Sequence, residues 1–275
     1  AMADHLVGST DVPTTRRIFR FPLKDDKNSS GKTEAPRSSG DRSVPAADAK
    51  VSFIDVTIQE MMLGDYGLYV WPSAIMLADF IYQNPEQIRG KRILELGAGT
   101  GLPGILCAKL GAQQVILTDS GDSAHVLKNL RQVTKMNGVD ERCRVQELVW
   151  GDFNKAALDL KPELVIGADV FYRTEDFEDI LATVGCYFRL RIEGGASTTT
   201  KDRKRSGALP KPAGLKFITV FQNRSNTVGL SPLLEHWRMS MSVIPFEPAS
   251  SESIPDRRSL CLVCIERNDR QLPIA

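Results

Sequence analysis

Apolar and polar positions follow two different rhythms along the chain, and these rhythms predict where strands and helices lie. From residue 91 onward, short apolar runs alternate with segments of helical periodicity, which is typical of parallel strands joined by helices. The last two strands have little predicted structure between them, so we expect them to form an antiparallel hairpin at one edge of the sheet. The expected strands are 93–97, 115–119, 144–150, 164–170, 217–222, 242–246 and 260–266, and the expected helices are 102–110, 124–136, 177–190 and 232–239.

Two more patterned segments precede this region. Residues 17–21 and 51–58 both suit strands, and we expect them to pair as an accessory hairpin. Residues 24–50 between them are rich in Ser, Asp, Lys, Gly and Pro, a composition that buries too little apolar surface to order itself. A helix is predicted to begin at Pro72, because proline suits a first helical position and the apolar residues after it share one face.

The pattern predicts an α/β protein built on a mainly parallel sheet, with the following organisation. Residues 1–50 are expected to be largely flexible, residues 51–267 to form one domain, and residues 268–275 to form a tail. Within the domain, residues 193–214 read as a flexible loop insertion rich in Gly, Ser and Thr. The basic run 201–205 in that loop fits a nuclear signal, an RNA-binding patch or a merely solubilising segment.

Composition narrows the functional classes. The 275 residues are 42% hydrophobic and 25% charged, which is ordinary for a globular protein. A net charge of +1 predicts no strong attraction to nucleic acid or to anionic membranes. No apolar run is long enough to cross a bilayer, and no signal-peptide pattern is evident. We therefore expect a soluble intracellular monomer, present in cytoplasm and nucleus, without membrane or direct nucleic-acid binding.

The cysteines do not predict a metal or redox centre. There are five of them, scattered along the chain, which suggests reduced thiols. Cys261 and Cys264 form a C-x-x-C, but they lie in an apolar run that suits a strand, where residues three apart point to opposite faces. Without a second pair, we interpret them as two small apolar residues of a buried strand, and we expect no metal site.

The strongest chemical signal is a glycine-rich loop between the first strand of the alternating region and its helix. It reads Glu95-x-Gly97-x-Gly99-x-Gly101 and contains no phosphate-binding lysine, so a nucleoside triphosphate is not the first expectation. The spacing fits a loop that curls around the amino-acid end of S-adenosylmethionine. Asp119 ends the next strand, twenty-two residues after Gly97, where an acidic residue commonly binds ribose hydroxyls. Capping of the following helix is the alternative role for Asp119.

Other candidate residues fall where strands are expected to end, which is where ligands bind in open α/β sheets. Trp150 is expected to end the third strand, either covering an adenine ring or packing in the core. Asp169 and Tyr172 follow the fourth strand, and an acid beside an aromatic ring suits a cationic amine substrate. Glu175 belongs either to this site or to a solvated helix start. Trp71 is placed either to close over the cofactor or to pack beneath a helix.

Several segments in this order resemble a known family, the seven-β-strand, S-adenosylmethionine-dependent protein methyltransferases of methyltransferase-like family 16. The resemblance covers residues 51–266 except the loop 193–214, and each segment is modest alone while the ordered set is specific. It implies a Rossmann-like seven-stranded sheet and a methyltransferase activity. The segments are Gly67-Leu68-Tyr69-Val70-Trp71-Pro72-Ser73-Ala74, Leu94-Glu95-Leu96-Gly97-Ala98-Gly99-Thr100-Gly101, Leu117-Thr118-Asp119, Val149-Trp150-Gly151-Asp152 and Ala168-Asp169-Val170-Phe171-Tyr172.

The resemblance also implies roles for residues. Asp169 and Tyr172 would be catalytic and would face the substrate together with Glu175, and the substrate would be a protein nitrogen. Most of the family is directed at lysine, but one similar member acts on arginine of histone H3, and Asp169, Glu175 and Asp176 together suit a guanidinium. The expected function is arginine methylation of histone H3, with lysine methylation or a non-catalytic cofactor-binding scaffold as alternatives. The cofactor would be bound by Trp71, Glu95, Gly97, Ala98, Gly99, Thr100, Gly101, Asp119, Trp150 and Ala168.

Overall fold

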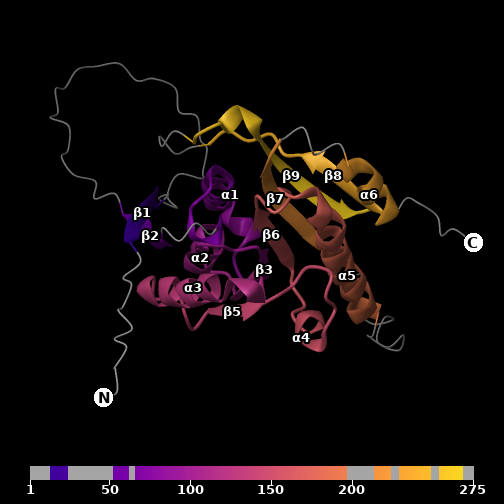
Figure 1. The fold of residues 1–275 in the computed structure, drawn as a ribbon, viewed down its shortest axis with the longest axis horizontal. Coiled ribbons are helices and arrows are strands. Elements are labelled where there is room, and N and C mark those ends of the chain that lie inside the picture. Colours follow the sequence, from indigo (N-terminus) through magenta and orange to yellow (C-terminus); the bar gives the residue numbers. More distant parts are fainter. Residues whose placement is uncertain are drawn as a thin grey trace, which may run out of the picture.

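A seven-stranded sheet forms the centre of the computed structural model. Its strand order is β5-β4-β3-β6-β7-β9-β8, and β9 runs in the opposite direction to the other six strands (Figure 1). The model describes residues 13–23, 52–61, 66–196, 214–223, 229–248 and 254–268. The strands are β3 (Arg92–Leu96), β4 (Gln114–Asp119), β5 (Cys143–Glu147), β6 (Leu164–Ala168), β7 (Lys216–Gln222), β8 (Met239–Val243) and β9 (Leu260–Arg267).

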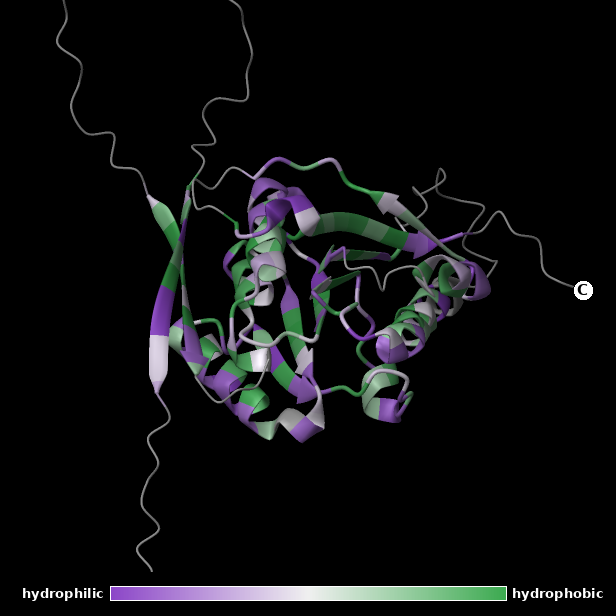
Figure 2. Cartoon of the chain, turned by 45° about the horizontal axis from the view of Figure 1, so that its top comes forward, coloured by the Kyte–Doolittle hydropathy of each residue, from purple (hydrophilic) through white to green (hydrophobic). Residues whose placement is uncertain are grey.

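Helices cover both faces of this sheet. One face carries α1 (Pro72–Gln83), α2 (Leu102–Lys109) and α3 (Ala124–Met136), and the other carries α4 (Lys155–Leu158), α5 (Phe177–Ala196) and α6 (Leu230–His236) (Figure 1). The central strands are mostly hydrophobic, as expected for strands buried on both faces (Figure 2). Short 3-10 turns lie at Tyr66–Leu68, Pro85–Gln87, Gly121–Ser123, Thr174–Asp176 and Arg257–Ser259.

A separate two-stranded ribbon packs on the α2 and α3 side of the molecule. Strands β1 (Thr14–Pro22) and β2 (Phe53–Met61) pair antiparallel, which confirms the expected accessory hairpin. The ribbon buries alternate residues, because a strand places successive side chains on opposite faces. Phe19, Phe21, Val56 and Ile58 thus join the apolar cluster that includes α1, α2 and α3.

The α/β fold and its antiparallel edge are confirmed, but several element boundaries differ from expectation. β5 ends at Glu147 rather than Trp150, because its only partner strand, β4, ends opposite it at Asp119. Helix α6 ends at His236, and a left-handed turn at Arg238 starts β8 at Met239, three residues early. Helix α5 runs to Ala196, so the predicted loop begins later; residues 197–213 lie outside the described part.

The chain ends lie mostly outside the described residues, whereas the cysteines lie within them. The predicted flexibility of the N-terminal region and of the C-terminal tail falls mostly on residues 1–12, 24–51 and 269–275, which are outside the described residues. Cys261 and Cys264 do face opposite sides of the sheet, since they belong to different apolar clusters. All five cysteines are free thiols. Among the described helices, none is long and apolar enough to cross a membrane.

The ribbon's contact with the core predicts a clear difference between two isoleucines. Ile58 on β2 is fully buried, whereas Ile18 on β1 is 58% exposed. Ile58→Ala should lower the free energy of unfolding by about 2–5 kcal/mol, because a buried side chain is lost and a cavity remains. Ile18→Ala should change it by less than about 0.5 kcal/mol. Urea denaturation measures both, and equal effects would contradict this packing of the ribbon.

Candidate active site

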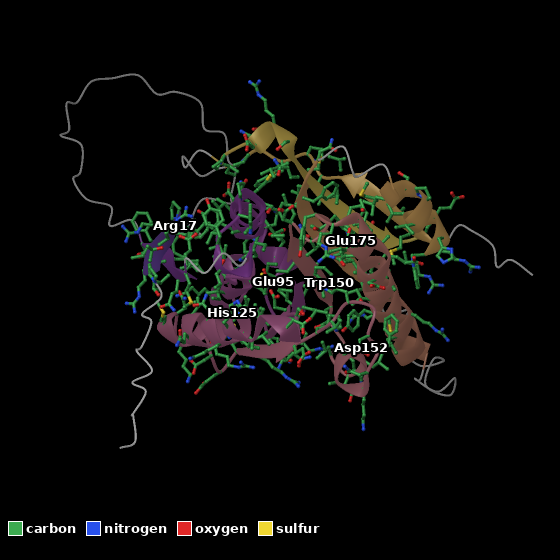
Figure 3. The ribbon with its side chains drawn as sticks, viewed as in Figure 1. Arg17, Glu95, His125, Trp150, Asp152 and Glu175 are labelled. Carbon is green, nitrogen blue, oxygen red and sulfur yellow. The ribbon has the colours of Figure 1, made fainter. Side chains whose placement is uncertain are left out.

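A cavity of about 680 Å³ opens at the carboxyl ends of β3, β4 and β6, where the sheet order reverses direction. This is the place where open α/β sheets bind ligands. Its floor comes from the glycine loop after β3, and its walls come from the segment before α1, the turn after β5 and the start of α5. Glu95 and Trp150 lie near the centre of the molecule in Figure 3. The predicted residues that line the cavity are Trp71, Glu95, Gly97, Ala98, Gly99, Thr100, Asp119, Trp150, Ala168, Asp169 and Tyr172.

The glycines of the loop are needed where other chain segments approach closely. Gly97 has a φ of 56°, and a Cβ there would lie 3.2 Å from the ring of Trp150. Gly99 has a φ of 52°, and a Cβ there would lie 3.2 Å from the carbonyl oxygen of Gly67. Both positions combine a backbone that L-residues rarely adopt with a tight contact. Side chains at these positions would strain the loop and narrow the cavity.

Asp119 holds the glycine loop against the neighbouring strand. Its Oδ2 accepts a hydrogen bond from the Gly99 N–H at 2.9 Å, and its Oδ1 accepts one from the Ser120 N–H at 2.9 Å. The Ala98 N–H also donates to the carbonyl of Thr118 at 2.8 Å. Helix capping, the alternative role, falls to Ser120, whose hydroxyl accepts from the Asp122 N–H. Asp119 therefore shapes the loop while its side chain also lines the cavity.

Glu95 is a buried carboxyl beneath the loop. It is 1% exposed and lies under the first turn of α2, where a Cβ on Gly104 would overlap its Oε2. Burial raises the pKa of Glu95 to about 8, the nearby charge of Asp119 adds to this rise, and the backbone N–H of Gly104 opposes it. At neutral pH the carboxyl is therefore mostly protonated, and it adds little negative charge to the cavity.

Two tryptophans line the cavity. Trp71 stands just before α1 and packs edge-on against Tyr69, with 5.3 Å between the ring centroids. Trp150 lies in the turn after β5, and its ring packs over Gly97. That turn is tied to α5, because the Gly151 N–H donates to the Thr183 hydroxyl at 2.9 Å. Trp71 thus packs against another residue of the cavity lining, whereas the turn that carries Trp150 is fixed by α5 outside the lining.

Carboxylates gather on the side of the cavity formed by β6 and α5. Asp169 follows β6 with a φ of 55°, and its Oδ1 accepts a long hydrogen bond from the Gln222 N–H at 3.5 Å. Asp176 and Asp179 also line the cavity. Tyr172 is 40% exposed at the mouth, and its pKa is raised by burial and by the charge of Asp176. This side suits a cationic group that carries hydrogen-bond donors.

Two predicted residues lie outside the cavity lining. Gly101 caps α2, where a Cβ would lie 2.8 Å from Leu130, so it acts on packing. Glu175 is turned outward and pairs with Arg173 at 2.9 Å, the solvated position that was its alternative role. The structure adds lining residues that the sequence alone did not single out as cavity walls. They are Gly67, Tyr69, Ala74, Pro103, Ser120, Leu148, Val149, Val170, Arg173 and Asp179, while Asp176, which the sequence grouped with Asp169 for a guanidinium, also lines the cavity.

The cavity fits S-adenosylmethionine on several independent grounds. The glycine loop leaves space for a close ligand, Asp119 offers a carboxylate to a ribose, and the indole of Trp150 offers an apolar face to an adenine. Within the described ranges, no three His, Cys, Asp or Glu side chains are grouped as a metal site would require.

Comparison with known proteins identifies the class as an S-adenosylmethionine-dependent methyltransferase. The model of methyltransferase family 16, described as lysine methyltransferase, matches residues 51–206. The chain belongs to this family. S-adenosylmethionine is accordingly its cofactor.

Its relatives act on proteins. The chain is 36% identical to mouse histone-arginine methyltransferase METTL23 over 75% of its own length and 73% of the relative. It is 38% identical to the human METTL23 protein, over 66% of this chain and 83% of the relative. Mouse protein N-lysine methyltransferase METTL21A is 36% identical over 42% of this chain and 53% of the relative. Protein methylation is therefore the activity of this enzyme.

A solved structure shows a more distant likeness. The Thermus thermophilus 16S rRNA N2 G1207 methyltransferase, in complex with AdoMet and guanosine, is 16% identical. It has a TM-score of 0.48 and covers 78% of this chain and 47% of its own.

The buried carboxyl of Glu95 predicts a pH-dependent stability. Since its folded pKa of about 8 lies above the ordinary 4.5, the folded state holds a proton that the unfolded state has lost across this window. The stability that protonated Glu95 contributes to the folded state is fully present below pH 4.5 and is lost as the pH rises through 8. Against Glu95→Gln, which stays neutral, the wild type should lose up to about 1.4 kcal/mol per pH unit in that window.

Urea unfolding of the cofactor-free protein between pH 5 and pH 8.5 measures this difference. Glu141→Gln removes an exposed carboxyl by the same substitution, and its stability at each pH is the baseline against which that of Glu95→Gln is compared. A constant offset for Glu95→Gln relative to this baseline would show that Glu95 is ionised in the folded protein.

Proposed function

We propose that this protein methyltransferase acts on arginine, with histone H3 as its protein substrate. The observation that supports arginine is the carboxylate-rich wall formed by Asp169, Asp176 and Asp179 at the mouth of the cavity. A guanidinium presents several N–H donors in one plane, so it suits several carboxylates better than a compact ammonium does. The METTL23 relatives, which are named histone-arginine methyltransferases, support the same choice.

In this proposal the loop 97–100 and Asp119 bind the amino-acid end and the ribose of the cofactor, and Trp150 covers the adenine. Trp71, Glu95 and Ala168 complete the walls of this cofactor site. Bound S-adenosylmethionine supplies a methyl group on a positively charged sulfur, which makes the methyl carbon electrophilic. The protein's own task is to align a neutral nitrogen with that methyl and to exclude water.

Asp169 and Tyr172 carry the substrate side of the proposal. Asp169 would take a proton from the target guanidinium and direct the lone pair of the resulting neutral nitrogen toward the methyl. The new nitrogen–carbon bond would form as the carbon–sulfur bond breaks and S-adenosylhomocysteine leaves, and Asp176 would stabilise the positive charge that the nitrogen gains. Tyr172 lies beside them at the mouth and offers its ring face to the cation. Glu175 stays at the rim, paired with Arg173, and takes no direct part.

Lysine methylation is the second candidate. The description of the matching family model and the METTL21A relative both favour it. The same carboxylates would accept an ammonium, which must lose a proton before it can act as a nucleophile.

We further propose a monomer that acts in cytoplasm and nucleus, since a histone is synthesised in the cytoplasm and incorporated into chromatin in the nucleus.

The target residue is tested by methylation of histone H3. Wild-type protein is incubated with labelled methyl donor and histones, and the modified residue is mapped by mass spectrometry. We expect label on arginine, and loss of at least about 100-fold in turnover for Asp169→Asn, because a carboxylate that acts in the transition state is removed. Label on lysine only would select the second candidate. If no histone is labelled, the proposal that histone H3 is the substrate is wrong.

The cofactor site is tested by titration calorimetry. Asp119→Ala should weaken S-adenosylmethionine binding by at least about 100-fold, because both the ribose contact and the hydrogen bond to Gly99 are lost. Asp140→Ala removes the same charge from an exposed position that does not line the cavity and should bind as wild type does. Unchanged affinity in Asp119→Ala would place the cofactor elsewhere.

A further inference from the structure

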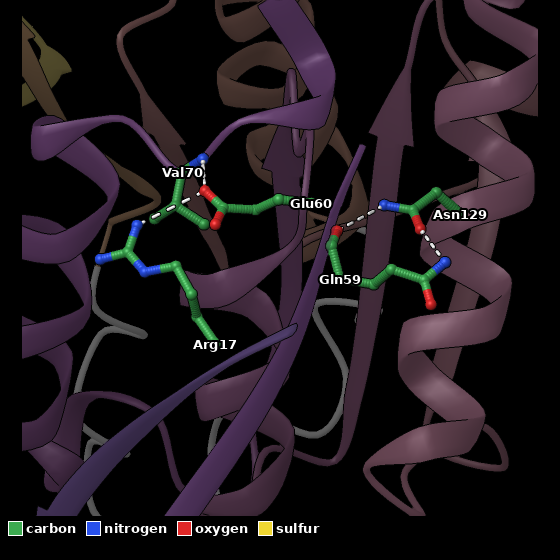
Figure 4. A network of polar contacts seen from close by, with 5 residues as sticks. All are labelled: Arg17, Gln59, Glu60, Val70 and Asn129. Atoms are coloured by element: carbon green, nitrogen blue, oxygen red, sulfur yellow. Dashed lines mark hydrogen bonds and ion pairs between the residues drawn. The ribbon is translucent and has the colours of Figure 1, made fainter. Parts of the chain in front are cut away.

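Strand β2 of the accessory ribbon carries two adjacent polar residues that are almost fully buried. Gln59 is 9% exposed and Glu60 is 8% exposed, and they point in opposite directions because they are neighbours on a strand (Figure 4). Buried polar side chains are costly unless they are hydrogen-bonded, so each has a structural reason to be there. The two residues contact different parts of the molecule.

Gln59 joins the ribbon to helix α3. Its Nε2 donates to the Asn129 Oδ1 at 3.0 Å, and the Asn129 Nδ2 donates back to the Gln59 backbone carbonyl at 3.0 Å (Figure 4). Asn129 itself is 1% exposed. This contact fixes the ribbon to the body of the protein through two residues that do not line the cavity.

Glu60 joins the ribbon to the cavity wall instead. Its Oε1 accepts a hydrogen bond from the Val70 N–H at 2.9 Å and forms an ion pair with the Arg17 guanidinium at 3.4 Å (Figure 4). Val70 is 1% exposed and stands between Tyr69 and Trp71, both of which line the cavity. A single carboxylate thus holds the backbone that presents two aromatic walls.

The same segment also touches the floor of the site. A Cβ placed on Gly99 would lie 3.2 Å from the carbonyl oxygen of Gly67. The segment before α1 therefore packs closely against the glycine loop. Displacement of Val70 would therefore move Trp71 on one side and disturb the contact with Gly99 on the other. Pre-organised walls lower the ordering cost of binding, which is how such a contact changes affinity.

We propose that Glu60 is a positioning residue for the cofactor, and that the N-terminal ribbon is a working part of the active site. Glu60 contacts neither cofactor nor substrate and acts through Val70 on Trp71 and Tyr69. The inference rests on the proposed place of the cofactor in the cavity. It gives the ribbon a role beyond packing, because Glu60 of the ribbon bonds to the backbone between Tyr69 and Trp71.

The test compares cofactor affinity and thermal stability in matched variants. Glu60→Met removes the polar contact between β2 and Val70, and Asn129→Leu removes the polar contact between β2 and α3. Each substitution keeps a similar side-chain volume, and both should lower the melting temperature. Only Glu60→Met should weaken S-adenosylmethionine binding, by about tenfold, the effect of losing a hydrogen bond to a charged acceptor. Glu60→Gln keeps an oxygen for the Val70 N–H and should bind within about threefold of wild type.

Three outcomes decide the matter. Wild-type affinity in Glu60→Met, or equal weakening in Asn129→Leu, overturns the inference, since the effect would be absent or merely one of stability. If Glu60→Met does not fold, Glu60→Asp keeps the charge but is too short to reach Val70, and it should show the same weakening. Asp119→Ala is the reference: wild-type affinity there would mean that the cofactor site itself is misplaced.

Discussion

The hydrogen bond from the Gly99 N–H to the Asp119 carboxylate is the constraint on which the site depends. It joins the ends of two neighbouring strands, and the Ala98–Thr118 backbone bond reinforces it one residue earlier. The glycines of the loop between β3 and α2 have positive φ angles, and fixing a glycine in one conformation costs more conformational entropy than fixing any other residue. The loop therefore needs hydrogen bonds that hold it in place. Because Asp119 anchors the loop and also lines the cavity, the proposed function gives its side chain a role in both loop conformation and cofactor binding.

The cavity is chemically divided, and the division matches a reaction between a bulky cofactor and a cationic nitrogen. One part is formed by backbone and indole surfaces, with a carboxyl at Glu95 that burial keeps mostly neutral. The other part carries Asp169, Asp176 and Asp179. An ionised carboxylate under the loop would add repulsion toward Asp119, and its protonation keeps this second negative charge out of the part of the cavity that Asp119 lines.

Much of this arrangement could be predicted from sequence, because local signals and topology agree. The glycine spacing, the acid at the end of β4 and the strand-helix alternation are all local, and the carboxyl ends of parallel strands necessarily meet. Tertiary contacts decided the rest. The end of β5 depends on where its partner strand stops, and the outward turn of Glu175 depends on Arg173. Asp179 lines the cavity only because the turn at Gly151 packs on α5, which no local pattern reveals.

The order of strands at the antiparallel edge has a consequence for how the chain is assembled. Within the described residues, β8 pairs only with β9, yet it precedes β9 along the chain. β9 also inserts between β7 and β8, so β7 keeps an open edge until β9 arrives. During synthesis on the ribosome, the finished half of the sheet therefore waits with an unpaired border, the interval in which a nascent chain is most exposed to aggregation or to capture by a chaperone.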